Sequence, residues 1–130
     1  MNPRKTNQDH TLVVMAEDNR FDCREVSRSF EEASHPSQLV CFENGQQLMD
    51  GLATLENVAC ILLDMNMPVM DGFAVMEQLD NHPKLGDIPI FVMTSSSDHQ
   101  EILEDKGCQP TAFIRKPVSF DDVRSLLSGR

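Results

Sequence analysis

Apolar residues along the chain fall into five short runs, and polar segments with a different spacing separate them. Each run is too short for a helix and most include β-branched side chains, which is typical of a buried strand. Between the runs, apolar residues recur at three- and four-residue steps, which predicts amphipathic helices. The expected strands are 11–16, 38–42, 60–63, 88–93 and 111–114, and the expected helices are 20–33, 48–55, 73–79, 98–106 and 120–127.

The order of these elements predicts the fold class. Strands that alternate with helices are joined by parallel crossovers, and strands that are apolar throughout are covered on both faces. The sequence therefore predicts a doubly wound α/β domain with a five-stranded parallel sheet and five helices. The helix at 98–106 has the weakest pattern, because Ile102 and Leu103 supply nearly all of its apolar face.

The length of 130 residues allows one domain with a single core. We expect that domain at residues 11–128, after a loose polar tail at 1–10. No apolar run approaches the roughly 20 residues that span a bilayer. The amino-terminal segment also lacks the apolar centre of a secretory signal. We therefore expect a cytoplasmic protein that does not bind a membrane.

The four cysteines, Cys23, Cys41, Cys60 and Cys108, form no C-x-x-C pair and show no cysteine–histidine spacing typical of a metal site. Cys41 and Cys60 lie inside apolar strand patterns. We therefore expect reduced, buried thiols rather than a disulfide.

The charge of the chain restricts the classes of partner. The formal net charge is −10, and the sequence contains no basic stripe. A surface of this sign disfavours contact with nucleic-acid phosphates. It suits steering toward a basic protein partner instead.

Chemically reactive side chains stand where four of the expected strands end. Glu17 and Asp18 follow the first strand, Asp64 the third, Thr94 the fourth and Lys116 the fifth. The carboxyl ends of parallel strands share one edge of a sheet, which is where such sheets bind ligands. Each residue also has an ordinary explanation as a helix cap, a turn cap or an exposed charge. Their joint occurrence at four strand ends favours a site.

Three converging carboxylates repel one another unless a cation lies between them. Oxygen ligands without histidine or cysteine select a hard ion, and Mg²⁺ is the expected one. The charges of Glu17, Asp18 and Asp64 would then be balanced by Mg²⁺ and Lys116. A phosphoryl group on Asp64 would replace one negative charge by roughly −1.5 to −2. The Thr94 hydroxyl and the Lys116 ammonium are suitable hydrogen-bond donors to the phosphoryl oxygens that carry this extra charge.

Residues 11–128 resemble a CheY-like receiver domain of a two-component response regulator. The resemblance rests on Glu17-Asp18, on Asp64 with its following Asn66-Met67-Pro68 and Asp71-Gly72, on Thr94-Ser95, and on Phe113 with Lys116-Pro117. It implies a flavodoxin-like strand order of 2-1-3-4-5 and a cis peptide bond between Lys116 and Pro117.

The resemblance also implies a role for each site residue. Asp64 would be the phosphoacceptor, attacking a phosphohistidine on a histidine kinase or phosphotransfer protein. Asp18 would bind Mg²⁺ directly, with Glu17 binding directly or through water. Asn66 would offer the metal its backbone carbonyl, and Thr94 would bind the phosphoryl oxygens.

Lys116 would bind the same phosphoryl oxygens, and Phe113 would be the aromatic switch that moves inward when Thr94 is drawn to the phosphate. Two positions depart from the usual pattern. Phe113 stands where tyrosine is common, so a switch here lacks a hydroxyl hydrogen bond. Ser95 stands where a small residue is frequent, and its hydroxyl can alter access to the phosphoryl group.

Three functions are compatible with these residues. The first is a phosphorylation-controlled signalling module, not an enzyme, whose output is contact with a target protein or a second copy. The second is an adaptor that keeps the fold without the phosphorylation switch, against which the intact acid set argues. The third is a Mg²⁺-dependent phosphohydrolase with an aspartyl nucleophile. It would need a cap domain or a further acid, for which 130 residues leave little room.

Overall fold

The computed structural model describes residues 11–34, 37–65, 67, 69–94 and 110–128. Its strands are β1 (Thr11–Ala16), β2 (Ser37–Phe42), β3 (Val58–Asp64), β4 (Ile90–Thr94) and β5 (Ala112–Arg115). Its helices are α2 (Arg20–Glu32), α3 (Gly45–Leu52), α4 (Gly72–Asp80) and α6 (Phe120–Ser128). The expected tail at 1–10 and the expected helix at 98–106 lie outside the described residues.

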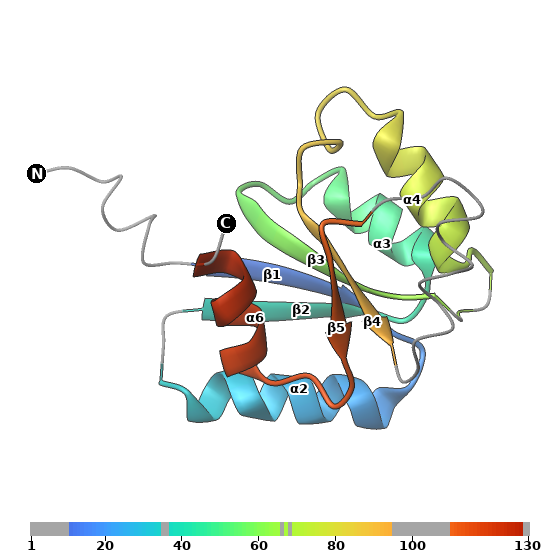
Figure 1. The fold of residues 1–130 in the computed structure, drawn as a ribbon. Helices are drawn as coiled ribbons and strands as arrows, with labels where there is room; N and C mark the ends of the chain where they lie inside the picture. Colours follow the sequence, from blue (N-terminus) through green and yellow to red (C-terminus); the bar gives the residue numbers. More distant parts are fainter. Residues whose placement is uncertain (1–10, 35–36, 66, 68, 95–109, 129–130) are drawn as a thin grey trace, which may run out of the picture.

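All five strands are parallel and form one sheet in the order β2-β1-β3-β4-β5, as the resemblance implied. Helices α2 and α6 cover one face of the sheet, and α3 and α4 cover the other (Figure 1). This arrangement confirms the predicted doubly wound architecture. None of the described helices combines the length and the apolar character that a membrane crossing requires.

The domain has two hydrophobic cores, one on each face of the sheet, and the central strands contribute to both. Val14 and Ala16 of β1 pack into the core under α3 and α4, whereas Val13 and Met15 pack under α2 and α6. Side chains alternate between the faces of a strand, so a strand covered on both faces is apolar at every position. On the α2 and α6 side, the rings of Phe30 and Phe120 meet edge to face at a centroid distance of 5.1 Å.

Helix α2 begins directly after the acid pair, because Asn19 caps it. The Asn19 side-chain oxygen accepts hydrogen bonds from the backbone N–H groups of Phe21 (2.8 Å) and Asp22 (3.2 Å). This cap fixes the direction in which the chain leaves β1. The other helix starts are capped in the same way: Asn44 caps α3 and Asp71 caps α4. Ser119 caps α6, accepting from Asp122 N–H at 3.2 Å.

Replacing Asn19 by alanine is expected to lower the free energy of unfolding by about 1 kcal/mol, because two backbone N–H groups lose their acceptor. Urea denaturation followed by circular dichroism measures the change. Asn19→Ser should retain most of the stability, since serine also caps helices well. Equal losses in both variants would show that the cap is not the cause.

The expectation of reduced thiols is wrong for two of the cysteines. Cys23 on α2 and Cys41 on β2 form a disulfide, with their Cα atoms 6.4 Å apart. Apolar neighbours in the sequence had suggested a buried thiol for Cys41. However, β2 is an edge strand of the sheet, and both cysteines are only partly buried. Cys60 on the central strand β3 is fully buried, as expected.

Candidate functional site

The candidate site lies at the carboxyl edge of the sheet, where β1 and β3 end side by side. Ala16 and Leu63 are paired across the two strands, so Glu17 and Asp64 follow at matching positions. The backbone N–H of Glu17 donates to the Phe42 carbonyl at 2.9 Å, which continues the β1–β2 ladder past the last strand residue. Two neighbouring strands therefore fix the backbone that carries these acids.

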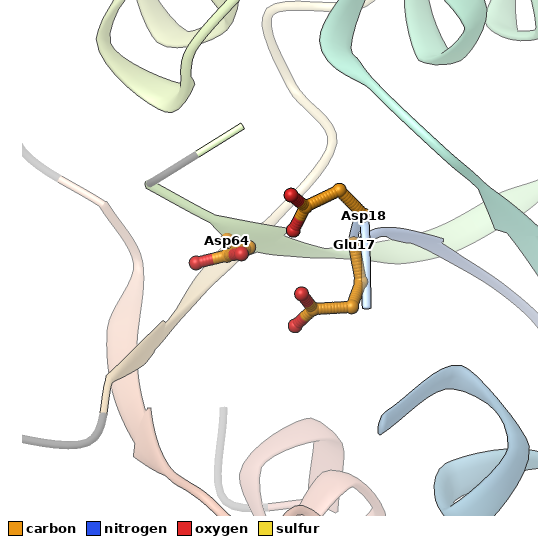
Figure 2. A group of neighbouring side chains, drawn as sticks. All are labelled: Glu17, Asp18 and Asp64. Atoms are coloured by element: carbon orange, nitrogen blue, oxygen red, sulfur yellow. The ribbon is translucent and has the colours of Figure 1, made fainter. Parts of the chain in front are cut away.

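The structure brings the three predicted carboxylates together. One carboxylate oxygen from each of Glu17, Asp18 and Asp64 lies within 4.8 Å of the other two. Figure 2 shows the three side chains in one region beside the end of β3. Glu17 and Asp64 are buried, with exposed fractions of 2% and 6%, whereas Asp18 is exposed. The group is therefore anchored in the core on one side and open to solvent on the other.

Lys116 supplies the cation that the sequence predicted. It follows β5, and its backbone N–H donates to the Thr94 carbonyl at 2.9 Å, which ties the ends of β4 and β5 together. Its Nζ lies 2.8 Å from Glu17 Oε1 and 3.9 Å from Asp64 Oδ1. The Lys116–Pro117 peptide bond is cis, in agreement with the prediction.

Burial and neighbouring charges shift the pKa values of both groups in this ion pair, Glu17 and Lys116. Burial raises the pKa of Glu17 to about 7, because desolvation and the nearby Asp64 carboxylate outweigh the hydrogen bond from Lys116. Burial lowers the pKa of Lys116, but the hydrogen bond to Glu17 and the charges of Asp64, Glu17 and Asp22 raise it more, so its pKa lies above the ordinary value. Lys116 is therefore a permanent cation beside a carboxyl group that protonates easily.

This donor set fits a divalent cation. The group is composed of carboxylates alone, which is the ligand chemistry of hard ions such as Mg²⁺ and Mn²⁺. A metal ion would offset the repulsion among the three acids that Lys116 alone cannot balance. The residues present can therefore hold a metal, with Glu17, Asp18 and Asp64 as its protein ligands.

Of the remaining predicted residues, the structure describes Thr94 and Phe113 but not Asn66 and Ser95. Thr94 is the last residue of β4 and is paired with Arg115, next to Lys116. Phe113 is partly buried and packs against the core under α3 and α4, so its switch role stays a prediction. Asn66 and Ser95 lie outside the described residues, and so does the predicted metal contact through the Asn66 carbonyl.

One residue near the site was missed by the sequence reasoning. Asp22 on α2 places its Oδ2 3.4 Å from Lys116 Nζ. The two residues are 94 positions apart, and the only signal in the sequence is that Asp22 falls in the first turn of the helix that follows the acid pair. Acids are common in that position because they favour the positive end of the helix dipole.

The comparisons with known proteins agree with this geometry. Residues 13–128 match the family described as the response regulator receiver domain. Probable methanogenesis regulatory protein FilR2 of Methanothrix harundinacea is 25% identical over 122 residues, which cover 90% of this chain and 79% of that protein.

Two solved structures of phytochrome response regulators are also similar. The bacteriophytochrome response regulator AtBRR superposes with a TM-score of 0.81 at 24% identity, covering 91% of this chain and 90% of its own. The phosphorylated cyanobacterial phytochrome response regulator RcpA superposes with a TM-score of 0.73 at 25% identity, covering 92% and 90%. The match across residues 13–128, together with the acids and lysine at the sheet edge, shows that the chain belongs to the response regulator receiver domain family.

Proposed function

We propose that this receiver domain accepts a phosphoryl group on Asp64 in a Mg²⁺-dependent reaction. The observation that carries the proposal is a buried carboxylate with two further acids within 4.8 Å and a lysine ammonium at 3.9 Å. This arrangement combines a nucleophilic oxygen, a metal-binding group and a fixed positive charge. RcpA, one of the structural neighbours, was solved in a phosphorylated form.

The donor would be a phosphohistidine on a histidine kinase or on a phosphotransfer protein. An Asp64 oxygen forms a bond to phosphorus while the phosphorus–nitrogen bond breaks, and the imidazole leaves with the bonding electron pair. Mg²⁺ bound by Glu17, Asp18 and Asp64 would supply charge neutralisation for the incoming phosphoryl group. Lys116, and Thr94 at the end of β4, would donate hydrogen bonds to the phosphoryl oxygens.

The output would be a change in protein–protein contact, with a downstream target or with a second copy of the chain. Phosphorylation can act only by favouring one of two conformations that differ in their contacts with the phosphoryl group. Thr94 on β4 and Phe113 on β5 are the residues proposed to link the site to that change. The domain would not turn over substrates, apart from slow hydrolysis of its own acyl phosphate.

Incubation with Mg²⁺ and acetyl phosphate or phosphoramidate tests this function. Intact-mass spectrometry should detect a gain of one phosphoryl group, and chelation of Mg²⁺ should prevent it. A chain that stays unmodified with both donors would contradict the proposal and favour the adaptor function. Continuous release of phosphate from small phosphate esters would favour the phosphohydrolase function instead.

Metal affinity is expected to depend on pH, because Mg²⁺ and a proton compete for Glu17. The pKa of Glu17 in the metal-free protein is raised to about 7. The affinity should therefore rise from pH 6 to pH 8 and fall about tenfold per pH unit well below pH 7. Titration calorimetry at pH 6, 7 and 8 measures this dependence.

Two variants serve as controls for that titration. Glu17→Gln should bind Mg²⁺ more weakly but with a flatter pH dependence over the same range, because the competing proton site is gone. Asp18→Ala should lose measurable binding, because it removes an exposed ligand without altering the buried pair. An unchanged pH dependence in Glu17→Gln would assign the competing proton to another group.

A further inference from the structure

The Lys116 ammonium lies among three carboxylates, and only two of them belong to the acid group at the sheet edge. Its Nζ is 2.8 Å from Glu17 Oε1, 3.4 Å from Asp22 Oδ2 and 3.9 Å from Asp64 Oδ1. Asp22 comes from α2 rather than from a strand end. It is therefore closer to the lysine than the proposed phosphoacceptor is, while lying outside the proposed metal ligands.

The start of α2 holds Asp22 in this position. The Asn19 cap accepts a hydrogen bond from the Asp22 backbone N–H at 3.2 Å, and Asn19 directly follows Asp18 in the chain. The helix start is thus linked through the backbone to the acid group. Cys23, the next residue, is joined to Cys41 on β2 by the disulfide, which further limits movement of this turn.

Asp22 and Lys116 also line a small cavity of about 60 Å³ between α2 and the turn that follows β5. Apolar side chains form much of its wall: Met15, Val26, Met93 and Val118. The side chains of Asp22 and Lys116 have exposed fractions of 41% and 25%. The pair is therefore partly screened by solvent, and its attraction is moderate rather than strong.

We propose that Asp22 is a positioning residue that holds Lys116 in a resting position and competes with the phosphoryl group on Asp64 for its ammonium. The inference rests on the proposed phosphorylation of Asp64. A metal ion bound by Glu17 and Asp64 would neutralise part of their negative charge and so weaken their attraction for Lys116. Asp22 would not bind the metal, so its attraction for Lys116 would be unchanged. Asp22 thus slows the movement of Lys116 to the incoming phosphoryl group.

Replacing Asp22 by asparagine tests the proposal. The phosphorylation rate constant with acetyl phosphate at saturating Mg²⁺ should increase about two- to fivefold, which is the range for a partly exposed ion pair. Asp22→Glu should stay close to the wild-type rate, because it restores the charge on the same turn. Thermal denaturation of each variant separates a change in rate from a change in stability.

Loss of any negative charge near the site could also accelerate phosphorylation by an anionic donor such as acetyl phosphate. The matched control for this effect is Glu25→Gln. Glu25 lies on the next turn of α2, lines the same cavity and forms an ion pair with Arg28 at 3.5 Å. Its neutralisation should leave the rate within about 1.5-fold of the wild type, because a solvent-exposed charge is largely screened. An acceleration equal to that of Asp22→Asn would overturn the proposal.

The dependence on the lysine itself gives the second readout. In a Lys116→Ala background, Asp22→Asn should no longer accelerate phosphorylation, because its partner is absent. The same acceleration in both backgrounds would contradict the proposal while leaving phosphorylation of Asp64 intact. A wild-type protein that takes up no phosphoryl group would instead overturn the proposed function, so the two failures are distinguishable.

Discussion

Asp64→Asn is expected to take up no phosphoryl group from acetyl phosphate or phosphoramidate under conditions in which the wild-type protein is modified. An amide lacks the nucleophilic carboxylate oxygen, and the acid group loses one of its charges. Folding should survive, because Asp64 is buried among repelling acids and its neutralisation relieves that repulsion in the metal-free protein. Intact-mass spectrometry and circular dichroism measure the two effects.

The matched control is Asp71→Asn. Asp71 is an exposed acid in the segment after β3, and its side chain accepts a hydrogen bond from the Ala74 N–H at 3.0 Å as the cap of α4. Asparagine caps helices as well as aspartate does, so this variant removes a nearby charge at little cost in stability. It should still be phosphorylated. A phosphoryl group that persists in Asp64→Asn would place the acceptor elsewhere.

Loss of the Cys23–Cys41 disulfide is expected to lower the free energy of unfolding by about 3 kcal/mol, on the basis of the loop that it closes. The two cysteines are 18 residues apart in the sequence. The bond restricts the unfolded chain and also ties the start of α2 to the edge strand β2. Urea denaturation with and without a dithiol reductant measures the difference.

The double variant Cys23→Ser, Cys41→Ser is the control for the reductant. It should match the reduced wild-type protein in stability and should not respond to reductant. A Cys108→Ser background prevents exchange with that thiol. Equal stability of the oxidised and reduced wild-type protein would show that the crosslink contributes nothing to folding.

The sequence predicted the sheet well because its strands are buried on both faces. Every position from Val13 to Ala16 is apolar and buried, and a short run of this kind indicates a strand that is covered on both faces. The helix boundaries were predicted less accurately. The apolar stripe indicated a helix at 48–55, but α3 begins at Gly45, because the Asn44 side chain caps it by accepting from the Gln47 N–H at 2.8 Å.

The acid group could be predicted because parallel strands bring their carboxyl ends to one edge. This rule places Glu17, Asp64 and Lys116 together without any knowledge of the packing of helices. The contact of Asp22 with Lys116 and the pairing of Cys23 with Cys41 could not be predicted in this way. Both depend on how α2 is seated against the sheet, which is decided by side-chain packing rather than by strand order.

The separation of the acids from their lysine has a consequence during protein synthesis. Glu17 after β1 and Lys116 after β5 are 99 residues apart in the sequence, and their side chains meet at 2.8 Å. A nascent chain that has not yet reached β5 carries the mutually repelling acids without the ammonium that offsets them. Addition of β5 at the sheet edge brings in Lys116, whose charge offsets part of this repulsion. Lys116, which follows the last strand of the domain, thus offsets part of the negative charge that follows the first strand.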